Sequence, residues 1–434
     1  MAAGLSVDLE GWRREFDELM LRVGDRFARV EPRRRMAAFV RGLLAGLPRV
    51  NCWTLAEHAG ERCPRGMQRL LSSAVWDEAG MRDDLRGYVL EHFADPAAVL
   101  VVDETGDVKK GTATAGVQRQ YTGTAGRTEN AQVAVYLAYA APAGSAFVDR
   151  ALYLPRSWTS DPARCAAAGV PGDTAFATKP ALATEMITRA LDAGTPAGWV
   201  AGDEVYGQDP QLRAELARRG QGYVLAIRKS DPVLTPAGPL PAAELARRLP
   251  ARAWQRLSAG PGAKGPRWYD WALVEAADPA VTEGGGPHWL LIRRRIGDGE
   301  LAFYRAHAPH LVPLAQLVHV AGSRWKVEDG FAGGKELTGL DEHQVRSWTS
   351  WHRWTILALL AYAFLSVLAS QAAAGHSGGG QLIPLTRHEI RRLLTGLSRQ
   401  LAAPAAQLHW SRWRRRHQAT ARNCHYRRRA QTPT

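Results

Sequence analysis

Cysteine is scarce in this sequence, with four residues among 434. No two of them form a C-x-x-C pair, so neither the disulfide framework of a secreted scaffold nor a structural zinc knuckle is predicted. The first 24 residues carry several acidic side chains and no apolar run, unlike a signal peptide. A reducing cytoplasm is therefore the expected compartment. The cysteines are Cys52, Cys63, Cys165 and Cys424.

Glycine and proline are also too few for a disordered or fibrous chain, with 42 and 25 residues. Hydrophobic residues make up 46% and charged residues 23%, as in soluble globular proteins. At roughly one domain per 150 residues, a chain of this length has room for about three.

Acidic residues are absent from the C-terminal 45 residues, which carry 11 arginines. The preceding 389 residues are nearly balanced, with 45 basic and 42 acidic side chains, although the whole chain has a net charge of +14. Lysine is rare, at 7 residues against 49 arginines, which indicates a GC-rich genome and gives the choice of arginine little meaning. The missing acids are informative, and they predict a tail that contacts a polyanion.

Charge is missing from a second segment, residues 354–375, which is long enough to span a bilayer. The segment contains Thr355, Ser366, Ser370 and Gln371 among many alanines. A buried helix that packs on a central sheet explains it as well. A lone, late span without a second candidate fits a membrane protein poorly, so no membrane is expected.

Residues 1–95 are predicted to be helical, and apolar residues recur at helical spacing from Met36 to Leu47. Residues 54–60, a turn with Gly60 and Pro64, and residues 65–71 resemble a helix-turn-helix. Such a unit would direct exposed polar side chains toward a DNA groove, whereas an ordinary helical hairpin would not. Those side chains are Arg65, Gln68 and Arg69.

From residue 97 the pattern changes to strands. Short apolar or alternating runs predict strands at 98–103, 116–121, 130–139, 198–203 and 223–227, with a helix at 180–193. Residues 229–300 have an inserted character, since clusters of proline and glycine separate predicted strands at 268–274 and 289–293. Helical spacing returns at 324–336, and the apolar helix at 354 is expected to complete an α/β core.

Two acids end predicted buried strands: Asp103 in Val-Val-Asp-Glu-Thr-Gly and Asp203 in Ala-Gly-Asp-Glu-Val-Tyr-Gly. A third acid, Glu328, shares one predicted helix face with Arg324 and Lys335, which lie at i−4 and i+7 from it. Three converging carboxylates are suitable ligands for Mg²⁺ or Mn²⁺, and a pair of such ions supports phosphoryl transfer. The alternative is that these acids only cap turns or helices.

Several motifs resemble the bacterial DDE transposases of the insertion sequence 701 family. The resemblance is carried by residues 101–111 and 115–133, and by similar segments at 153–158, 176–180, 202–207 and 340–346. It extends over most of the chain, from about residue 35 to 395.

The resemblance implies an α/β fold with a ribonuclease-H-like catalytic core, a β-rich insertion and a preceding all-helical DNA-binding domain. The expected ranges are 1–95 for the helical domain, 96–228 and 311–389 for the core, 229–310 for the insertion and 390–434 for the basic tail. Asp103, Asp203 and Glu328 would take the DDE roles and bind Mg²⁺ or Mn²⁺.

A related branch, that of insertion sequence 4, carries a Tyr-x2-Arg-x3-Glu-x6-Lys signature around its glutamate. Arg324, Glu328 and Lys335 fit this signature, whereas Ala321 occupies the tyrosine position. By this resemblance Arg324 and Lys335 would clamp DNA phosphates, although both could merely pair with Glu328 and Asp329.

Other candidates have a structural alternative of equal or greater weight. Lys109, Lys110 and Arg119 would contact the DNA backbone or form a solvated basic turn. A tryptophan of the insertion would stack on an unpaired base, although packing of the insertion's own core is favoured. Tyr206 is expected to face the core beside Asp203. The four tryptophans are Trp254, Trp268, Trp271 and Trp289.

The function implied is a DNA transposase that cleaves at transposon ends and joins the 3′-OH ends to target DNA. Its partners would be double-stranded DNA, namely the terminal inverted repeats and the target, bound by a homodimer on paired ends in the bacterial nucleoid. A non-catalytic, transposase-derived regulator is the alternative, but it would not need intact metal ligands. A structure-selective nuclease without strand transfer would share the site and differ only in its products.

Overall fold

The computed structural model describes residues 8–235, 238–262, 265–281, 283, 285–375 and 384–398, and within the tail residues 409–410, 413–418, 420 and 424. By its contacts the chain forms two compact units. The helical unit comprises residues 1–81, 335–345 and 349–434, and the sheet unit comprises residues 82–334 and 346–348. The predicted core segment 311–389 is thus divided between the two units.

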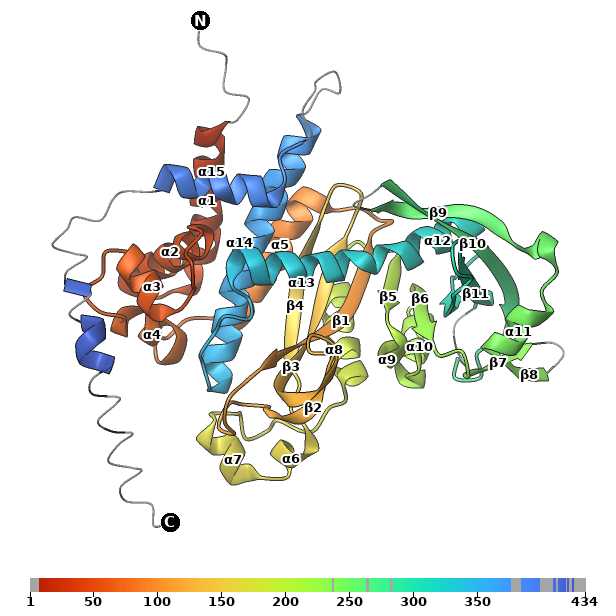
Figure 1. The fold of residues 1–434 in the computed structure, drawn as a ribbon, viewed down its shortest axis with the longest axis horizontal. Coiled ribbons are helices and arrows are strands. Elements are labelled where there is room, and N and C mark those ends of the chain that lie inside the picture. The colour runs from red at the N-terminus through yellow and green to blue at the C-terminus, as the bar shows by residue number, and fades with distance from the viewer. Residues whose placement is uncertain are drawn as a thin grey trace, which may run out of the picture. The chain divides into compact units, whose positions relative to one another are not determined.

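The helical unit is built from the chain's two ends. Its core uses the predicted apolar face, since Met36, Phe39, Val40 and Leu43 are all buried. The Asn51 side chain caps the third helix through the N–H groups of Trp53 and Thr54. The helices are α1 Leu9–Arg22, the 3-10 helix Val23–Arg26, α2 Val30–Leu44, α3 Cys52–His58, α4 Arg65–Ser72, most of α14 Trp348–Ala374, and α15 Arg387–Ser398 (Figure 1).

Helix α14 is the apolar segment noted in the sequence. It is the one helix in the described part of the chain long and apolar enough to cross a membrane, and 72% of its most apolar window is buried. Phe364 packs edge-on against Phe16 of α1 at 5.5 Å, and Trp354 packs against Phe39 of α2 at 5.4 Å between ring centroids. The helix is therefore a core helix, as one interpretation of its sequence predicted. It was expected to complete the α/β core, but its contacts group it with the helical unit.

The sheet unit contains one mixed sheet in the order β2-β3-β1-β5-β6-β12-β11-β10-β9, with β4 paired to β3. Strand β1 is antiparallel to β3 and parallel to β5, and β5 is parallel to β6. The predicted strands are confirmed, whereas β4, β9 and β12 of this sheet were not predicted. Their bounds are β1 Val99–Val108, β2 Gln118–Thr122, β3 Arg127–Ala140, β4 Ser145–Leu152, β5 Trp199–Gly202 and β6 Gly222–Ile227.

Buried runs explain the central strands. Val99 to Val102 are all fully buried, and every residue of β5 is buried, as in parallel strands covered on both faces. The helices of this unit are α5 Glu78–Phe93, which begins in the helical unit, α6 Arg156–Thr159, α7 Pro162–Ala167, α8 Lys179–Asp192, α9 Glu204–Gly207, α10 Pro210–Arg218, α12 Leu314–Ser323 and α13 Trp325–Thr338, whose last turn groups with the helical unit.

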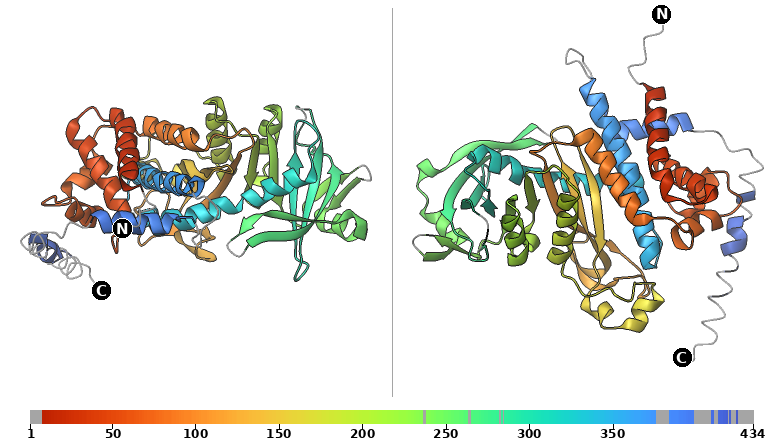
Figure 2. Two further views of the ribbon diagram at one scale, coloured as in Figure 1. Left: turned by 90° about the horizontal axis from the view of Figure 1, so that it is seen from above. Right: turned by 180° about the vertical axis from the view of Figure 1, so that it is seen from behind.

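The insertion continues the central sheet. Strand β12 pairs antiparallel with β6 from Phe303↔Ile227 to His307↔Tyr223, and β11, β10 and β9 follow in order (Figures 1 and 2). Its own apolar cluster includes Val233, Leu245, Leu290 and Ile292. The elements are β7 Pro232–Thr235, β8 Gly238–Pro241, α11 Ala242–Arg248, the 3-10 helix Ala251–Ala253, β9 Gln255–Gly262, β10 Gly265–Ala276, β11 His288–Arg295 and β12 Leu301–His307.

Candidate active site

Asp103 and Asp203 lie at the same level of the sheet, because the parallel pairing of β1 with β5 ends at Val102↔Gly202. Asp203 follows β5, as predicted. Asp103 does not end its strand, because β1 runs on to Val108 with β3 as its partner. What ends before Asp103 is the parallel pairing, and this suffices to bring the two acids together.

The local sequence fixes the position of Asp203. Its carboxylate accepts the N–H of Val205 at 2.8 Å and caps α9, so the capping role considered for this residue is real. Gly207 ends that short helix where a Cβ would clash with the carbonyl oxygen of Ala226. A side chain would push α9 off β6, so glycine at this position keeps Asp203 against the sheet.

The pKa values of both carboxylates are raised above the ordinary value for aspartate. Burial, with the neighbouring negative charge of Asp203, raises the pKa of Asp103 to about 7, although Arg324 opposes the shift. Burial and the charge of Glu104 likewise raise the pKa of Asp203. The pair therefore carries negative charge that the protein neutralises incompletely, and a bound cation would relieve it.

Arg324 connects Asp103 to Glu328. Its guanidinium donates to the Glu328 carboxylate at 2.8 Å and lies 3.5 Å from the Asp103 carboxylate. Glu328 stands in the first turn of α13, in the predicted helix. In the described part of the chain, no three His, Cys, Asp or Glu side chains are placed closely enough to hold a metal ion. The structure thus places Asp103 and Asp203 close together, whereas Glu328 is connected to Asp103 through Arg324.

Glu104 is a further acid that the sequence analysis left without a role. The Lys179 ammonium donates to its Oε1 at 2.6 Å, and the Tyr206 hydroxyl donates to its Oε2 at 2.6 Å. Tyr206 is fully buried, as expected. Glu104 follows Asp103 in β1, and Tyr206 belongs to α9, which Asp203 caps. The hydrogen bond between Glu104 and Tyr206 therefore connects the two segments that carry the acids. Lys179 lies in one of the motifs that carried the resemblance.

A groove of about 880 Å³ opens beside the acids. Asp203, Glu328 and Arg324 line it together with residues of β6, β10, β11 and β12. Nine of the twenty residues that line it are cationic or aromatic, and four are acids. The cationic and aromatic side chains are Arg228, Lys229, Arg267, Tyr269, Arg293, Phe303, Tyr304, Arg324 and Trp325.

Two arginines of this groove keep hydrogen-bonding capacity. The Nε atoms of Arg267 and Arg293 are buried and have no hydrogen-bond partner among the described residues. The Arg293 guanidinium stacks on the Tyr269 ring at 4.7 Å, and burial lowers the pKa of Arg267. Sequence reasoning missed both residues, because their convergence depends on the pairing of β12 with β6.

The tryptophans of the insertion mainly pack. Trp271 and Trp289 are buried, and Trp254 packs against the apolar cluster beneath the Arg294 guanidinium. Trp268 is 53% exposed. It alternates on β10 with Arg267 and Tyr269, which line the groove, so it faces away from the groove. The packing interpretation thus holds for three of the four.

The other predicted DNA contacts lie apart from the acids or on the surface. Lys109 is mostly buried and 3.8 Å from Asp107, whereas Lys110 is exposed in the turn after β1. Arg119 is exposed on β2. Lys335 is half-buried on α13, two turns beyond Glu328, and groups with the helical unit. Arg65, Gln68 and Arg69 are exposed on α4, as a recognition helix requires.

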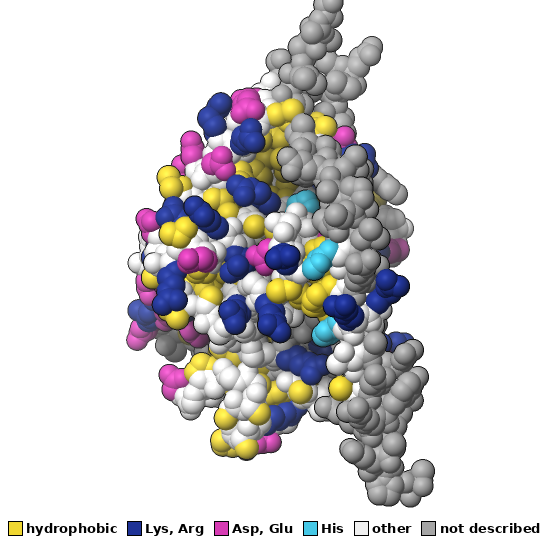
Figure 3. Space-filling view, turned by 90° about the vertical axis from the view of Figure 1, so that its left-hand side faces the viewer, with side chains coloured by type: hydrophobic (Ala, Val, Ile, Leu, Met, Phe, Trp, Pro, Cys, Tyr) yellow, Lys and Arg dark blue, Asp and Glu magenta, His cyan; other side chains and the backbone are white. Residues whose placement is uncertain are grey.

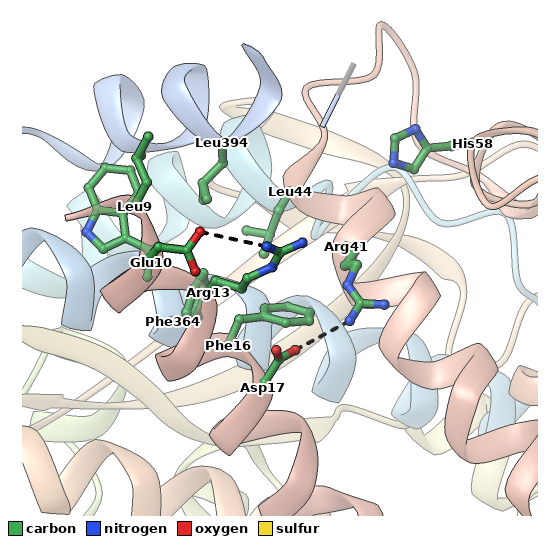
Figure 4. Close-up of a pocket in the computed structure, with 11 residues that line it drawn as sticks. Leu9, Glu10, Arg13, Phe16, Asp17, Arg41, Leu44, His58, Phe364 and Leu394 are labelled. Atoms are coloured by element: carbon green, nitrogen blue, oxygen red, sulfur yellow. Dashed lines mark ion pairs between the residues drawn. The ribbon is translucent and has the colours of Figure 1, made fainter. Parts of the chain in front are cut away.

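A second pocket, of about 720 Å³, lies in the helical unit between α1, α2, α14 and α15 (Figure 4). Phe16, Leu44 and Phe364 form its apolar lining, and Arg41 lies over the Phe16 ring at 4.9 Å. Its two acid–base pairs are exposed, at 3.8 Å for Arg13–Glu10 and 3.6 Å for Arg41–Asp17. Asp103, Asp203, Arg324 and Glu328 lie in the sheet unit and not in this pocket.

Comparisons with known proteins identify the family of this chain. Residues 22–272 match a family model described as DDE superfamily endonuclease. A probable transposase for insertion sequence element IS701, from Microchaete diplosiphon, is 30% identical over 191 residues, which is 44% of this chain and 47% of the relative. The match thus spans about half of that relative's length. A piggyBac transposase synaptic complex with hairpin DNA aligns over 94% of this chain and 84% of that chain, with 11% identity and a TM-score of 0.44, too low to establish a shared fold.

Proposed function

Because the chain belongs to the DDE superfamily of endonucleases, we propose that it is a transposase that cuts DNA at transposon ends and joins the 3′-OH ends to target DNA. The observation that carries this proposal is the placement of Asp103 and Asp203 side by side on β1 and after β5, at the edge of a cationic groove. Glu328, linked to Asp103 through Arg324, is the third acid of the proposed site.

The strand order supports a ribonuclease-H-like core. The order β4-β3-β1-β5-β6, with β1 antiparallel to β3 and parallel to β5, places three antiparallel strands beside two parallel ones. The first acid then lies on the central strand and the second follows the neighbouring parallel strand. Ligands of open α/β sheets bind at such carboxyl ends.

The donor set fits a divalent cation. Asp103 and Asp203 are hard oxygen ligands whose pKa values are raised by burial and then by neighbouring negative charge, which suits Mg²⁺ or Mn²⁺. Glu328 would complete the set once its carboxylate is released from Arg324. When bound, such ions activate an attacking water or hydroxyl and offset charge on the leaving oxygen.

The chain's own residues would position the substrate. Arg324, freed from Glu328, would reach a phosphate oxygen, since its guanidinium already lies within the groove. Arg267 and Arg293 would place positive charge beside the same strand, since both line the groove. Glu104 would hold the two aspartates in register through Lys179 and Tyr206. Lys335 remains a proposed phosphate contact from the last turns of α13.

The proposed partners are duplexes carrying the terminal inverted repeats, together with target DNA. Arg65 and Arg69 on α4 would read the repeat, while Lys109, Lys110 and the basic tail would contact the backbone. A homodimer on paired ends within the bacterial nucleoid is part of this proposal.

Incubation of the protein with a labelled transposon end and Mg²⁺, followed by mapping of the products, tests the function. A nick at the transposon end and a joined product with target DNA are the expected results. Nicked DNA without joined product would favour a structure-selective nuclease. Binding without any cleavage would favour the non-catalytic regulator, which the acids of the groove argue against.

A further inference from the structure

Trp413, Arg414 and His417 of the basic tail are docked on α3. Trp413 packs edge-on against Trp53 at 4.7 Å between ring centroids, and His417 packs on the same indole at 4.7 Å. Trp413 and His417 stack on each other at 5.3 Å, as expected for residues one helical turn apart. Trp410 contacts Trp413 at 5.5 Å and is only 3% exposed. Four aromatic rings thus fix one helical turn of the tail.

Polar contacts fix the same segment at two further points. Arg414 forms an ion pair with Glu57 of α3. The His409 imidazole lies 3.0 Å from the carbonyl oxygen of Arg62, in the turn between α3 and α4. A charged arm held only by attraction to a polyanion would need none of these contacts.

Docking places exposed arginines of the tail and of α4 in the same unit. Arg415 and Arg416 are exposed, as are Arg65 and Arg69. Figure 3 shows many Lys and Arg side chains, with Asp and Glu side chains among them, on the face that it draws. Positive charge fixed on a folded surface complements the phosphates of a duplex.

We propose that the docked tail and α4 form one composite surface for duplex DNA, in which the tail is held in place by Trp53 and Glu57. This inference rests on the proposed DNA-binding function and goes beyond it, because it joins the tail to α4 in one binding surface. The tail's contribution to affinity then depends on its position as well as on its charge.

A charge reversal at Glu57 distinguishes the docked tail from a tail that binds DNA as a free arm. Glu57→Arg breaks the pair with Arg414 and makes the helical unit more positive. Charge alone would tighten binding to a transposon-end duplex, whereas loss of docking would weaken it, by about tenfold if several phosphate contacts are lost. Glu31→Arg is the matched control, because Glu31 is exposed on α2 and the substitution changes the charge by the same amount.

The swapped double variant Glu57→Arg/Arg414→Glu keeps the wild-type net charge and restores an ion pair. Binding should return toward the wild-type affinity, which would show that the two positions are coupled. Tighter binding by Glu57→Arg, equal to that of Glu31→Arg, would overturn the proposal.

Hydrogen exchange without DNA gives an independent measurement. Amides of residues 413–418 should be protected in the wild-type protein and should lose protection in Trp413→Ala, which leaves every arginine in place. Trp413→Ala should also weaken duplex binding as much as deletion of residues 411–434 does. Rapid exchange of 413–418 in the wild-type chain would refute docking, whereas a protected tail in a protein that binds no DNA would instead refute the proposed function.

Discussion

The hydroxyl of Tyr206 donates a 2.6 Å hydrogen bond to the carboxylate of Glu104, which lies 102 positions earlier in the chain. The bond joins the residue after Asp103 to the helix that Asp203 caps. It therefore ties together the two segments whose relative position the proposed chemistry depends on.

Tyr206→Phe should lower the rate of strand cleavage by a much larger factor than its loss of folding stability would explain. The substitution leaves a buried carboxylate one donor short, which costs about 1–3 kcal/mol of the free energy of unfolding. Tyr139→Phe is the matched control, because Tyr139 is also fully buried in this sheet and its hydroxyl donates at 2.7 Å to the carbonyl oxygen of Pro196. Cleavage rates and urea unfolding should be measured for both. Equal losses of cleavage would show that Tyr206 has only a structural role.

Stability without metal should fall as pH rises from about 4 to about 7. Asp103 keeps its proton up to a pKa of about 7 in the folded state, against an ordinary value of 3.8, so the folded protein holds a proton that the unfolded chain has released. The protonated Asp103 therefore contributes to the free energy of unfolding at low pH. This contribution, roughly 4 kcal/mol at most, is lost as the pH rises to about 7. Asp103→Asn should therefore raise the melting temperature at pH 8, and by clearly less at pH 5.

Added Mg²⁺ provides the complementary measurement. It should stabilise the wild-type protein at pH 8 and should not stabilise Asp103→Asn. The exposed Asp173→Asn should behave as the wild type at both pH values. An equal response of Asp103→Asn to Mg²⁺ would remove Asp103 from the metal ligands.

Glu328→Gln should abolish cleavage and joining together, by orders of magnitude, since one site would perform both steps. The amide keeps the shape of the side chain, so duplex binding should persist. Mg²⁺ and Mn²⁺ should support the wild-type reaction, and Ca²⁺ should not, because it prefers longer bonds and looser geometry. Asp329→Asn, next along α13, is the control. Cleavage by Glu328→Gln at the wild-type rate would exclude Glu328 and turn attention to Asp329 and Glu336.

Arg293→Gln should weaken processing of the transposon end about 10- to 100-fold, the range for loss of one charged hydrogen bond. Arg294→Gln should have little effect. The two residues are neighbours on β11, but only Arg293 lines the groove, while Arg294 donates to Asp270 at 3.1 Å. Both variants should be compared by single-turnover cleavage at one salt concentration. Similar losses would indicate a general effect of charge on the insertion and not a contact in the groove.

Arg65→Ala and Arg69→Ala should reduce the preference for the terminal repeat over random duplex. Exposed side chains of a recognition helix read base edges, whereas phosphate contacts carry no sequence information. Competition binding with both duplexes measures the ratio. An equal loss on both would assign these arginines to the backbone.

The sequence predicts the central strands well because burial leaves a direct mark on composition. Residues 98–103 and 198–203 are apolar runs ending on an acid, and both are strands. Strand β4 escaped because it includes Asp149 and Arg150, whose charges are buried in the structure and break the apolar pattern. The apolar run of α14 indicated burial correctly, but composition cannot say which elements cover it.

The candidate site was predictable only where a local sequence pattern marks a residue. Asp103 and Asp203 could be selected from strand ends, and Glu328 from its spacing to Arg324. Bonds that span the chain left no such signal, as between Glu104 and Tyr206, and the groove depends on pairing between strands some 80 residues apart. The pair of Arg324 with Glu328 was considered from their i,i+4 spacing, whereas the contact of Arg324 with Asp103 depends on three-dimensional placement.

The pairing of β12 with β6 has a consequence for the chain's architecture. The insertion is joined to its host by a continuous ladder of backbone hydrogen bonds, so its strands β10, β11 and β12 share one sheet with β1 and β5, which position Asp103 and Asp203. Removal of residues 229–307 would not leave a smaller enzyme. It would uncover the N–H and C=O groups of residues 223–227 as a bare, apolar edge strand, a ready template for self-association.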